Sequence, residues 1–361
     1  MRDRMKGLIL AGGHGTRLRP LTHTGPKQLI PLANKPNILY CLEDLRDAGI
    51  TDIGVVLGDI MPEKVKELLG DGSLFGTRIT YIVQGFPAGI AHAILCAEPF
   101  MGDEPFCVYL GDNVLKGGIR TMVREFEEHH YDAEVMLCHV PNPDKFGVAE
   151  LDGEGHIVSL IEKPKAPKSD LALVGIYLLR KGIFPIIHGL KPSWRNELEI
   201  TEALDQLRHQ GGRIKAHTVT GWWKDTGKPE DILEANHLLL EDIERHIEGA
   251  VEAGARVEGR VRIGPGSIVK GGSVIRGPAV IGRDCVIGPE AYVGPYTSIG
   301  DGSRLVGADI ESSIVIGDAI IETRHKIVNS LIGRYATVRS AEGRLPKGQQ
   351  LIIGENSTLF L

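Results

Sequence analysis

Aliphatic residues recur at every sixth position in the C-terminal third of the chain. Glycine directly follows the aliphatic residue in five of these repeats, and compact residues stand two positions before most of them. A six-residue period predicts triangular coils that each turn one aliphatic side chain per face inward, so that stacked coils share a continuous core. The register loosens after Leu305, and Ile332 and Val338 recover it. The unbroken series is Val257, Ile263, Val269, Ile275, Ile281, Ile287, Val293, Ile299 and Leu305.

Before this repeat, from residue 5 to about 225, apolar strand-like runs alternate with helical patterns. Such alternation predicts an α/β sheet with helices on both faces. An amphipathic helix is expected to begin at Pro229 and to connect the two parts over residues 229–248. We therefore expect a first domain over residues 1–245 and a second over 250–361. The expected strands are Gly7–Leu10, Ile53–Leu57, Arg78–Val83, Phe106–Leu110 and Ala133–His139, and the clearest helix is Pro62–Leu69.

A glycine-rich loop follows the first expected strand. It has three glycines within residues 12–15, and Arg17 and Lys27 come after them. Glycines let backbone N–H groups approach an anion closely, and the two cations add positive charge. The loop lacks the lysine of a Walker A motif, and it has Leu18 where a Rossmann fingerprint needs glycine or alanine. These residues predict a binding site for the phosphates of a nucleotide.

The overall composition argues against several classes of protein. The 361 residues carry a formal net charge of −6 without a basic block, so a nucleic-acid partner is not expected. Apolar runs stay short of the ~18 residues of a membrane span, and the first residues do not resemble a signal peptide. We therefore expect a cytoplasmic protein with no membrane partner. The five cysteines are odd in number and far apart, which favours buried free thiols over disulfides or a zinc site.

Residues 10–18, Leu-Ala-Gly-Gly-His-Gly-Thr-Arg-Leu, followed by Pro-Lys-Gln at 26–28, resemble the signature of sugar-phosphate nucleotidylyltransferases. Within that family, the chain resembles the long form of the members that act on dTTP and glucose 1-phosphate, from Met5 to about Ile353. The resemblance implies a nucleotide-diphospho-sugar transferase fold, which is a Rossmann-like mixed sheet. It also implies that the six-residue repeat forms a left-handed parallel β-helix.

The resemblance further implies the residues of the site. A glutamine amide beside a glycine backbone suits the edge of a pyrimidine base, and a carboxylate at a strand end beside a triphosphate loop is a typical Mg²⁺ ligand. The implied nucleotide-binding residues are Leu10, Ala11, Gly12, Gly13, Gly15, Thr16, Arg17, Lys27, Gln28, Gln84, Gly89 and Asp112. The implied sugar-phosphate-binding residues are Asn113, Gly147, Glu162, Lys163, Val174 and Arg195. Asp112 and Asp225 would hold Mg²⁺, and with Arg17, Lys27 and Lys163 they make up the implied catalytic set.

The implied reaction joins dTTP and glucose 1-phosphate into dTDP-glucose and releases pyrophosphate. The sugar phosphate is already an anion at neutral pH, so positioning and charge neutralisation would suffice for in-line attack on the α-phosphorus. UTP or another hexose phosphate stays open as a substrate, because the thymine methyl is worth only ~1–3 kcal/mol in a pocket.

Two other functions stay open for the C-terminal part or for the whole chain. The repeat is shared by acyltransferases, in which His325 could act as a base, although Arg324 and Lys326 flank it in a stretch where the repeat has lapsed. A catalytically inactive scaffold is disfavoured, because the chain keeps the expected aspartates and lysines. We also expect the β-helix to mediate homo-oligomer formation.

Overall fold

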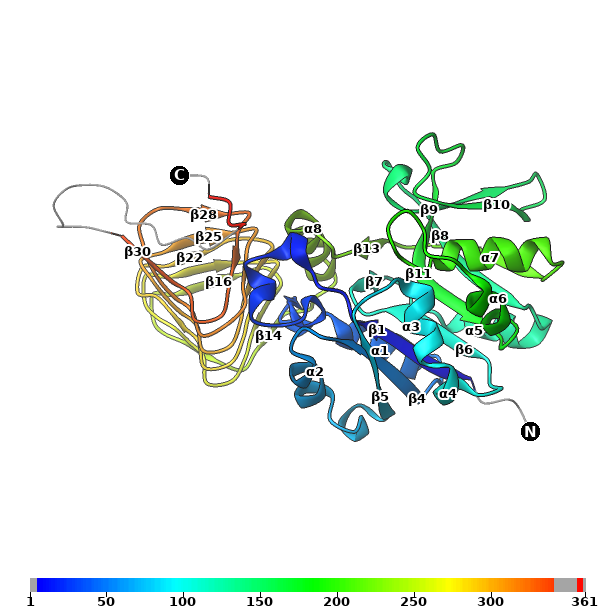
Figure 1. Cartoon of the computed structure of the whole chain (residues 1–361). Coiled ribbons are helices and arrows are strands. Elements are labelled where there is room, and N and C mark those ends of the chain that lie inside the picture. Colours follow the sequence, from blue (N-terminus) through cyan, green and yellow to red (C-terminus); the bar gives the residue numbers. More distant parts are fainter. Residues whose placement is uncertain (1–4, 341–355, 360–361) are drawn as a thin grey trace. The chain divides into compact units, whose positions relative to one another are not determined.

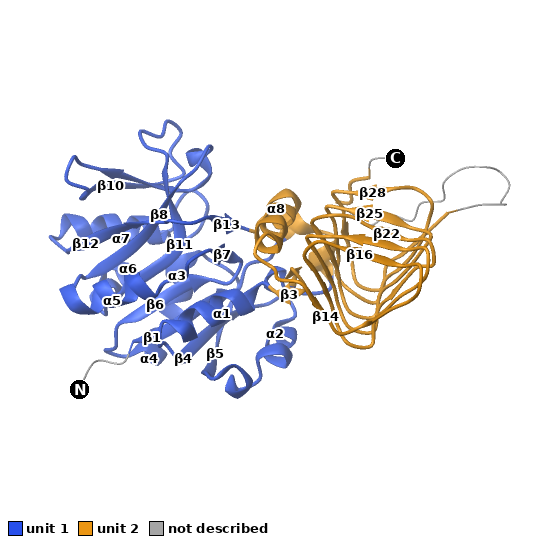
Figure 2. Ribbon diagram, turned by 180° about the vertical axis from the view of Figure 1, so that it is seen from behind, with its two compact units in different colours: residues 1–15, 24–29, 37–225 blue, residues 16–23, 30–36, 226–361 orange. Residues whose placement is uncertain are grey.

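The computed structural model describes residues 5–340 and 356–359. Figure 2 shows two compact units: residues 1–15, 24–29 and 37–225 form the first, and residues 16–23, 30–36 and 226–361 form the second. The short segment 30–36 belongs to the second unit because it is hydrogen bonded there. Ala33 N donates to Asn236 Oδ1 at 2.8 Å, and Asn34 Nδ2 donates to Ile299 O at 2.7 Å.

The units differ from the expected domain ranges in where the chain divides. The division falls after Asp225 rather than near residue 245, and the expected second domain includes residues 341–355 and 360–361, which lie outside the described residues. The expected connecting helix also ends early, because α8 covers Pro229–Leu240. His246–Ile247 forms strand β14 instead, since Ile247 pairs with Ile263 and packs against the core of the second unit.

The first unit is built on a nine-stranded mixed sheet (Figure 1). Strands β6, β1, β4 and β5 are parallel neighbours, and β11 runs antiparallel to β6, β8 and β9. Each strand expected from the sequence lies within an observed one. The strands are β1 Lys6–Ala11, β4 Asp52–Gly58, β5 Arg78–Gly85, β6 Phe106–Leu110, β8 Ala133–His139, β9 Gly147–Leu151, β10 Ile157–Glu162, β11 Leu171–Leu179 and β12 Ile214–Thr218.

Helices cover both faces of this sheet (Figure 1). Leu8 of β1 packs into the core with α3, α4, α6 and α7, and the next residue, Ile9, packs into the opposite core with α1, α2 and α5. Because both faces are buried, the central strands read as continuous apolar runs. The helices are α1 Ile38–Asp47, α2 Pro62–Leu69, α3 Ile90–Cys96, α4 Glu98–Met101, α5 Arg120–His129, α6 Ile183–Gly189 and α7 Ile200–His209.

Two further sheets have two strands each. β7 Asn113–Leu115 pairs antiparallel with β13 Trp223–Asp225, and β2 Pro31–Leu32 pairs with β3 Lys35–Pro36. Short 3₁₀ helices occupy Thr16–Leu18, Leu21–His23, Lys27–Leu29, Ser73–Phe75 and Pro143–Lys145. Among the described residues, no helix is both long enough and apolar enough to cross a lipid bilayer.

The six-residue repeat folds into three parallel sheets of short strands, which are the faces of the expected left-handed β-helix. On one face Ile281 pairs with Ile263 below and Ile299 above, and these side chains are at most 1% exposed. The six-residue spacing loosens after Leu305 because the coils become shorter, not because the stack of coils ends. Ile287 pairs with Leu305, which lies 18 residues later in the chain, whereas Leu305 pairs with Ile321, which lies 16 residues later.

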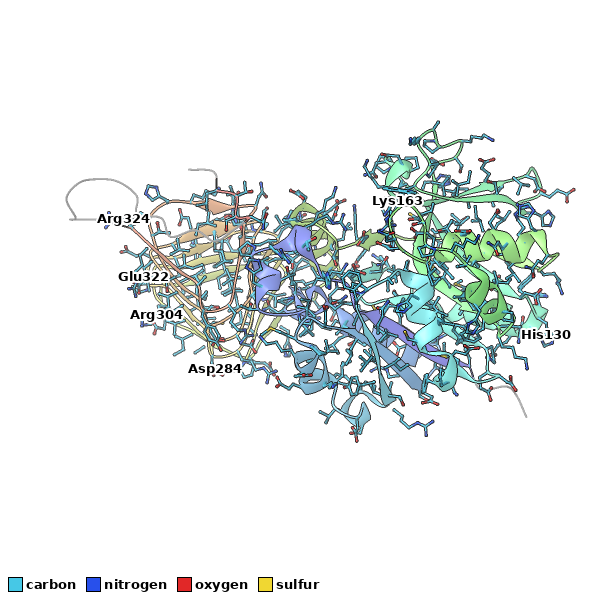
Figure 3. All side chains as sticks on the ribbon, viewed as in Figure 1. His130, Lys163, Asp284, Arg304, Glu322 and Arg324 are labelled. Atoms are coloured by element: carbon cyan, nitrogen blue, oxygen red, sulfur yellow. The ribbon has the colours of Figure 1, made fainter. Side chains whose placement is uncertain are left out.

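The outward positions of these strands carry polar and charged side chains, such as Arg304 and Glu322 in Figure 3. The strands are β14 His246–Ile247, β15 Ala250–Val251, β16 Arg256–Glu258, β17 Val261–Ile263, β18 Ile268–Val269, β19 Val274–Arg276, β20 Ala279–Ile281, β21 Val286–Ile287, β22 Tyr292–Val293, β23 Thr297–Ile299, β24 Arg304–Val306, β25 Asp309–Glu311, β26 Ile314–Val315, β27 Ile320–Glu322, β28 Ile327–Val328, β29 Leu331–Ile332 and β30 Thr337–Arg339.

Candidate active site

The glycine loop lies where the loops after β1, β4 and β5 meet. Parallel strands end at the same edge of a sheet, so these loops are neighbours. A Cβ added to Gly12 would lie 2.5 Å from Gln84 Oε1 and 3.4 Å from the backbone nitrogen of Gly58. His14 Nε2 lies 2.8 Å from Asp59 Oδ1 and links the same loops from their exposed side. Gly12 therefore allows an approach of backbone and amide that a larger residue would block.

Lys27 and Asp112 form an ion pair beside this loop. The ammonium of Lys27 donates to Asp112 Oδ2, and its Cε would lie 3.4 Å from a Cβ placed on Gly13. The other carboxylate oxygen, Asp112 Oδ1, accepts a hydrogen bond of 3.0 Å from Asn113 Nδ2. Burial disfavours the charged carboxylate, but Lys27 and the hydrogen bonds outweigh burial and lower the pKa of Asp112. Asp112 is thus an ionised carboxylate at the end of β6.

The small β7–β13 sheet places Asp225 beside Asp112. Asp225 pairs in register with Asn113, the residue that follows Asp112 in the chain. Directly paired residues of antiparallel strands have Cα atoms roughly 4.5–5.5 Å apart. Trp223 Nε1 fixes this pairing by donating a hydrogen bond of 2.6 Å to Asn113 Oδ1. The structure therefore places Asp225 opposite the chain neighbour of Asp112, although the two aspartates are far apart in the sequence.

Gln84 and Gly89 lie in the loop between β5 and α3. Gln84 Nε2 donates to Gly89 O at 3.3 Å and lies 3.2 Å from His92 Nδ1. Gly89 has a φ of +105°, and a Cβ there would lie 2.4 Å from Leu198 O, so both its backbone angle and its surroundings require glycine. The amide of Gln84 is consequently held toward the glycine loop.

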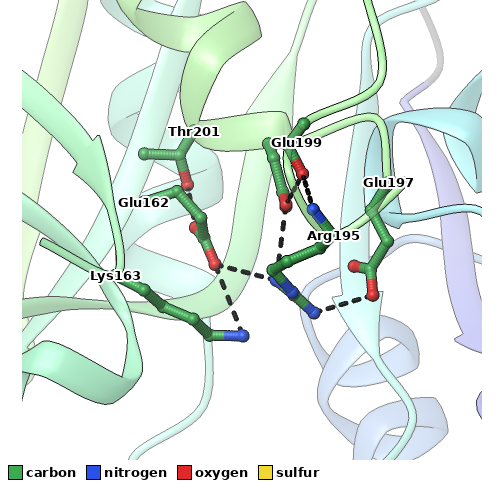
Figure 4. Close-up of polar contacts among 7 residues, drawn as sticks. Glu162, Lys163, Arg195, Glu197, Glu199 and Thr201 are labelled. Carbon is green, nitrogen blue, oxygen red and sulfur yellow. Dashed lines mark hydrogen bonds and ion pairs between the residues drawn. The ribbon is translucent and has the colours of Figure 1, made fainter.

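Glu162, Lys163 and Arg195 form a second cluster (Figure 4). Glu162 Oε2 accepts a hydrogen bond of 2.7 Å from Thr201 Oγ1, and Glu162 Oε1 lies 3.7 Å from Lys163 Nζ. Arg195 lies 3.3 Å from Glu162, 2.8 Å from Glu197 and 3.4 Å from Glu199. These distances are typical of ion pairs and hydrogen bonds between half-buried side chains.

The environment of Arg195 differs from that of a free phosphate-binding cation, because three carboxylates surround it. One of them, Glu199, is only 8% exposed, and burial raises its pKa, although a hydrogen bond from Ser193 opposes that shift. Lys163 (labelled in Figure 3) lies directly after β10 with a φ of +43°, a left-handed backbone conformation. Gly147 faces the same cluster, because a Cβ there would lie 2.6 Å from Thr201 Oγ1 and 3.1 Å from Glu162 Oε2.

The remaining expected residues fall into three kinds. Leu10, Ala11 and Val174 are buried in the two cores, so only their backbone atoms can face a ligand. Gln28 is 2% exposed and keeps a buried Oε1 that has no hydrogen-bond partner within the described part of the chain. Thr16 and Arg17 are exposed in the 3₁₀ helix of the second unit, and Gly15 precedes them in the first.

Several residues that surround the site were not expected from the sequence. Gly58 approaches Gly12 so closely that a Cβ on Gly58 would lie 2.4 Å from Gly12 O. His92 holds Gln84, and Glu197 and Glu199 hold Arg195. Gly58 could have been identified from the sequence, because it is a glycine directly at the end of a predicted parallel strand. His325, considered as a base in the β-helix, is exposed, and its backbone nitrogen donates to Thr323 Oγ1 at 3.2 Å.

Known proteins resemble this chain over most of its length. The profile of the nucleotidyl transferase family matches residues 6–242. A low-salt glycan biosynthesis nucleotidyltransferase, Agl11, of Haloferax volcanii is 53% identical over 99% of this chain and 100% of its own length. A glucose-1-phosphate thymidylyltransferase of Streptomyces antibioticus is 47% identical over 98% of both chains. Among solved structures, a Bacillus anthracis protein provisionally assigned as a glucose-1-phosphate thymidylyltransferase, in complex with a sucrose, superposes with a TM-score of 0.62. It is 40% identical and covers 67% of this chain and 97% of its own.

Proposed function

The chain belongs to the nucleotidyl transferase family and is a nucleotidyltransferase, and on that premise we propose that it makes dTDP-glucose from dTTP and glucose 1-phosphate. The observation that carries the proposal is the ion pair of Lys27 with Asp112 against the glycine loop. It joins a cation suited to phosphate with a carboxylate suited to a divalent ion. The similarity to thymidylyltransferases of glucose 1-phosphate supports these two substrates.

In this proposal an oxygen of the sugar phosphate attacks the α-phosphorus of dTTP, the bond from the α-phosphorus to the bridging oxygen breaks, and pyrophosphate leaves. Lys27 and Arg17 bind the triphosphate, and Lys163 and Arg195 bind the sugar phosphate. Glu162 orients the sugar by accepting hydrogen bonds from its hydroxyl groups. Gln84 and Gly89 hold the base. The two anions repel each other, so these cations accelerate the reaction chiefly by positioning and charge neutralisation.

Asp112 and Asp225 are the residues that would hold Mg²⁺. The fit rests on the ionised state of Asp112, on the register that sets Asp225 beside it, and on the preference of Mg²⁺ for carboxylate oxygens. When bound there, the ion would supply positive charge to the phosphate oxygens that become more negative during transfer. Lys27 already occupies one oxygen of Asp112, so metal and lysine share this carboxylate.

The substrates are tested by measuring pyrophosphate release with dTTP, UTP, ATP, GTP and CTP, each combined with the 1-phosphates of glucose, galactose, mannose and N-acetylglucosamine. We expect the highest kcat/KM for dTTP with glucose 1-phosphate. The kcat/KM for UTP should be roughly 10–200-fold lower, because one methyl group in a pocket can discriminate between substrates by that factor. A clear preference for a purine nucleotide, or for another hexose, would overturn the proposal.

The metal site is tested by Asp112→Asn and Asp225→Asn. Each should lower kcat by about 100-fold or more, because each removes a charge that acts on the transition state. Asp103→Asn is the matched control, since Asp103 is exposed and forms an ion pair with Lys181. Chelation of the wild-type enzyme should abolish turnover and Mg²⁺ should restore it. Unchanged turnover in both site variants would exclude these ligands.

We also propose that the β-helix mediates self-association. Ile268 and Val286 point outward from one face, and Ile268 is 37% exposed. Ala250 precedes them in this outward row, and Arg304 and then Ile320 follow Val286. Light scattering of the full chain should give a multiple of the monomer mass, and Ile268→Lys should reduce it. A monomeric wild-type protein would contradict the proposal.

The state of the cysteines supports a reducing, cytoplasmic compartment. All five thiols are free, and three of them are buried. Free thiols persist where glutathione and thioredoxin keep them reduced. Cell fractionation of the source organism should place the activity in the cytoplasmic fraction, and recovery in a membrane or exported fraction would exclude that location.

A further inference from the structure

A second group of potential metal ligands lies in the first unit, at the sheet edge formed by β12. It consists of Glu125 on α5, Glu134 on β8 and His217 on β12, whose ligand atoms all lie within 4.8 Å of one another. Strands β8, β11 and β6 separate β12 from β1, which carries the glycine loop. This group is therefore distinct from the aspartates of the candidate active site.

Glu134 is an unusual residue for its position. Along β8, Ala133, Val135 and Leu137 pack into one core, and Met136 packs into the other with α5. Glu134 faces the same side as Met136, since alternate residues of a strand share a face. Its side chain is 0% exposed, and neither carboxylate oxygen has a hydrogen-bond partner among residues 5–340 and 356–359. Burying an unpartnered carboxylate is costly unless another charge compensates for it.

His217 supplies part of this compensation. Its Nδ1 lies 3.6 Å from Glu134 Oε1 and 3.9 Å from Glu125 Oε2. Burial raises the pKa of Glu134, and the contact with Glu134 raises the pKa of His217. Lys215, which pairs in register with Glu134, is exposed and adds one further positive charge nearby. Both distances are longer than the length of a hydrogen bond, so the three side chains point toward one another without forming hydrogen bonds.

The geometry points to a divalent transition-metal site, and we propose that Glu125, Glu134 and His217 bind Zn²⁺. Zinc–ligand bonds of about 2.0–2.2 Å place tetrahedral ligand atoms roughly 3.3–3.6 Å apart. The two contacts of His217 need to shorten by only a few tenths of an ångström to reach that range, and the carboxylate oxygens of Glu125 and Glu134, which lie within 4.8 Å of each other, would close in on the ion. An imidazole nitrogen with two carboxylate oxygens suits Zn²⁺ better than Mg²⁺ or Ca²⁺, which prefer oxygen ligands alone. The ion would connect the edge strand β12 to α5 and thereby rigidify that edge.

The test is a titration of the metal-stripped full chain with Zn²⁺ by calorimetry, with Mg²⁺ in excess to saturate the aspartate site. We expect one Zn²⁺ per chain and a rise in melting temperature. Glu134→Gln and His217→Gln should each weaken Zn²⁺ binding by about 10–100-fold or more, because losing a metal ligand or a residue that orients a ligand has an effect of that size. His209→Gln is the control, because His209 is exposed and pairs with Asp205 within α7, a helix that carries none of the three proposed ligands.

A second variant and a second probe keep the test decisive if the buried variants unfold. Glu125→Gln removes a half-exposed ligand and leaves the contact between His217 and Glu134 in place, so it should fold and still weaken Zn²⁺ binding. Co²⁺ should give the visible absorption of a low-coordinate N,O site in wild-type protein and in Asp112→Asn, but not in Glu125→Gln. Equal Zn²⁺ binding by wild type and Glu125→Gln, or loss of the Co²⁺ signal in Asp112→Asn alone, would overturn the proposal.

Discussion

Lys27 donates to the carboxylate of Asp112 across 85 residues of sequence. The lysine begins the 3₁₀ helix Lys27–Leu29, and the aspartate lies two residues after the end of β6, which neighbours β1. The pair has a direct consequence for function. In the proposed roles, the cation for phosphate and the carboxylate for metal hold each other in place, so substrate and metal would both compete for groups that are already positioned.

Lys27→Ala should separate these two roles. We expect kcat to fall about 100-fold or more, because a charge that stabilises the transition state is lost. Binding of Mn²⁺, used as a probe of the aspartate site, should tighten, because Asp112 no longer shares an oxygen with an ammonium group. Lys66→Ala is the control, since Lys66 is exposed and pairs with Glu63. Weaker Mn²⁺ binding in Lys27→Ala would show that the lysine does not compete with the metal.

Gly147→Ala should impair the sugar-phosphate side of the site. The new Cβ would lie 2.6 Å from Thr201 Oγ1 and 2.8 Å from Leu173 Cδ1, so Thr201 must move and its hydrogen bond to Glu162 is disturbed. We expect KM for glucose 1-phosphate to rise about tenfold, which corresponds to ~1.4 kcal/mol, with little change for dTTP. Gly153→Ala, where nothing lies within 4 Å of the new Cβ, should leave both values unchanged.

Arg195→Ala should affect the same substrate through charge rather than shape. Its guanidinium balances Glu162, Glu197 and Glu199, so its removal leaves a net negative cluster facing an anionic substrate. KM for glucose 1-phosphate should rise at least about tenfold, and the rise should shrink at high ionic strength because salt screens the repulsion. Arg46→Ala, on an exposed arginine beside Asp47, serves as the control. An equal rise in KM for dTTP would assign Arg195 to the other substrate.

The sequence predicts the parts of the fold whose residues contact near neighbours in a regular pattern. Each aliphatic residue of the repeat packs on the coil above and below, so the spacing alone identifies the core, from Ile263 to Leu305. Five of the nine strands of the large sheet, β1, β4, β5, β6 and β8, are likewise predicted by their apolar runs, whereas β9 to β12 are not among the expected strands. The sequence does not predict that α8 ends at Leu240, because Ile247 fits the spacing of a helix but pairs with Ile263 in the β-helix.

The surroundings of the site depend on the order of strands, which no local pattern encodes. Gly58 approaches Gly12 only because β4 lies beside β1 in the sheet. The carboxylates around Arg195 come from β10 and from the turn before α7, and the sequence suggests a plain phosphate-binding arginine there. In the sequence, Glu134 is one polar residue within a predicted strand, and nothing there indicates a buried charge. Only the packing of α5 and β12 shows that it is a buried charge.

Ser267→Ala should destabilise the β-helix. Ser267 is 1% exposed; its Oγ donates to Gly282 O at 2.7 Å and accepts from Cys285 N at 2.9 Å, so it joins two successive coils. Alanine would leave both backbone groups buried without these bonds, at a cost of about 1–3 kcal/mol. Thermal unfolding followed by circular dichroism should show a lower melting temperature, and Thr337→Ala, at an exposed position in β30, should show none. An unchanged melting temperature in Ser267→Ala would mean that water replaces the hydroxyl.

Native thiol labelling should divide the cysteines by burial. Three cysteines are 0% exposed: Cys41, Cys107 and Cys285. Desolvation raises the pKa of each of these thiols. The pKa of Cys41 lies well above its usual value, because the nearby Asp44 adds to the effect of desolvation. Because the thiolate is the reactive form, these three should resist a disulfide reagent at pH 8, and raising the pH to about 9 should not speed their reaction. The half-buried Cys96 and Cys138 should react slowly, and denaturant should expose all five. Mass spectrometry of the labelled peptides assigns each site, and rapid labelling of Cys41 in the folded enzyme would contradict the packing of α1 against β6 and β7.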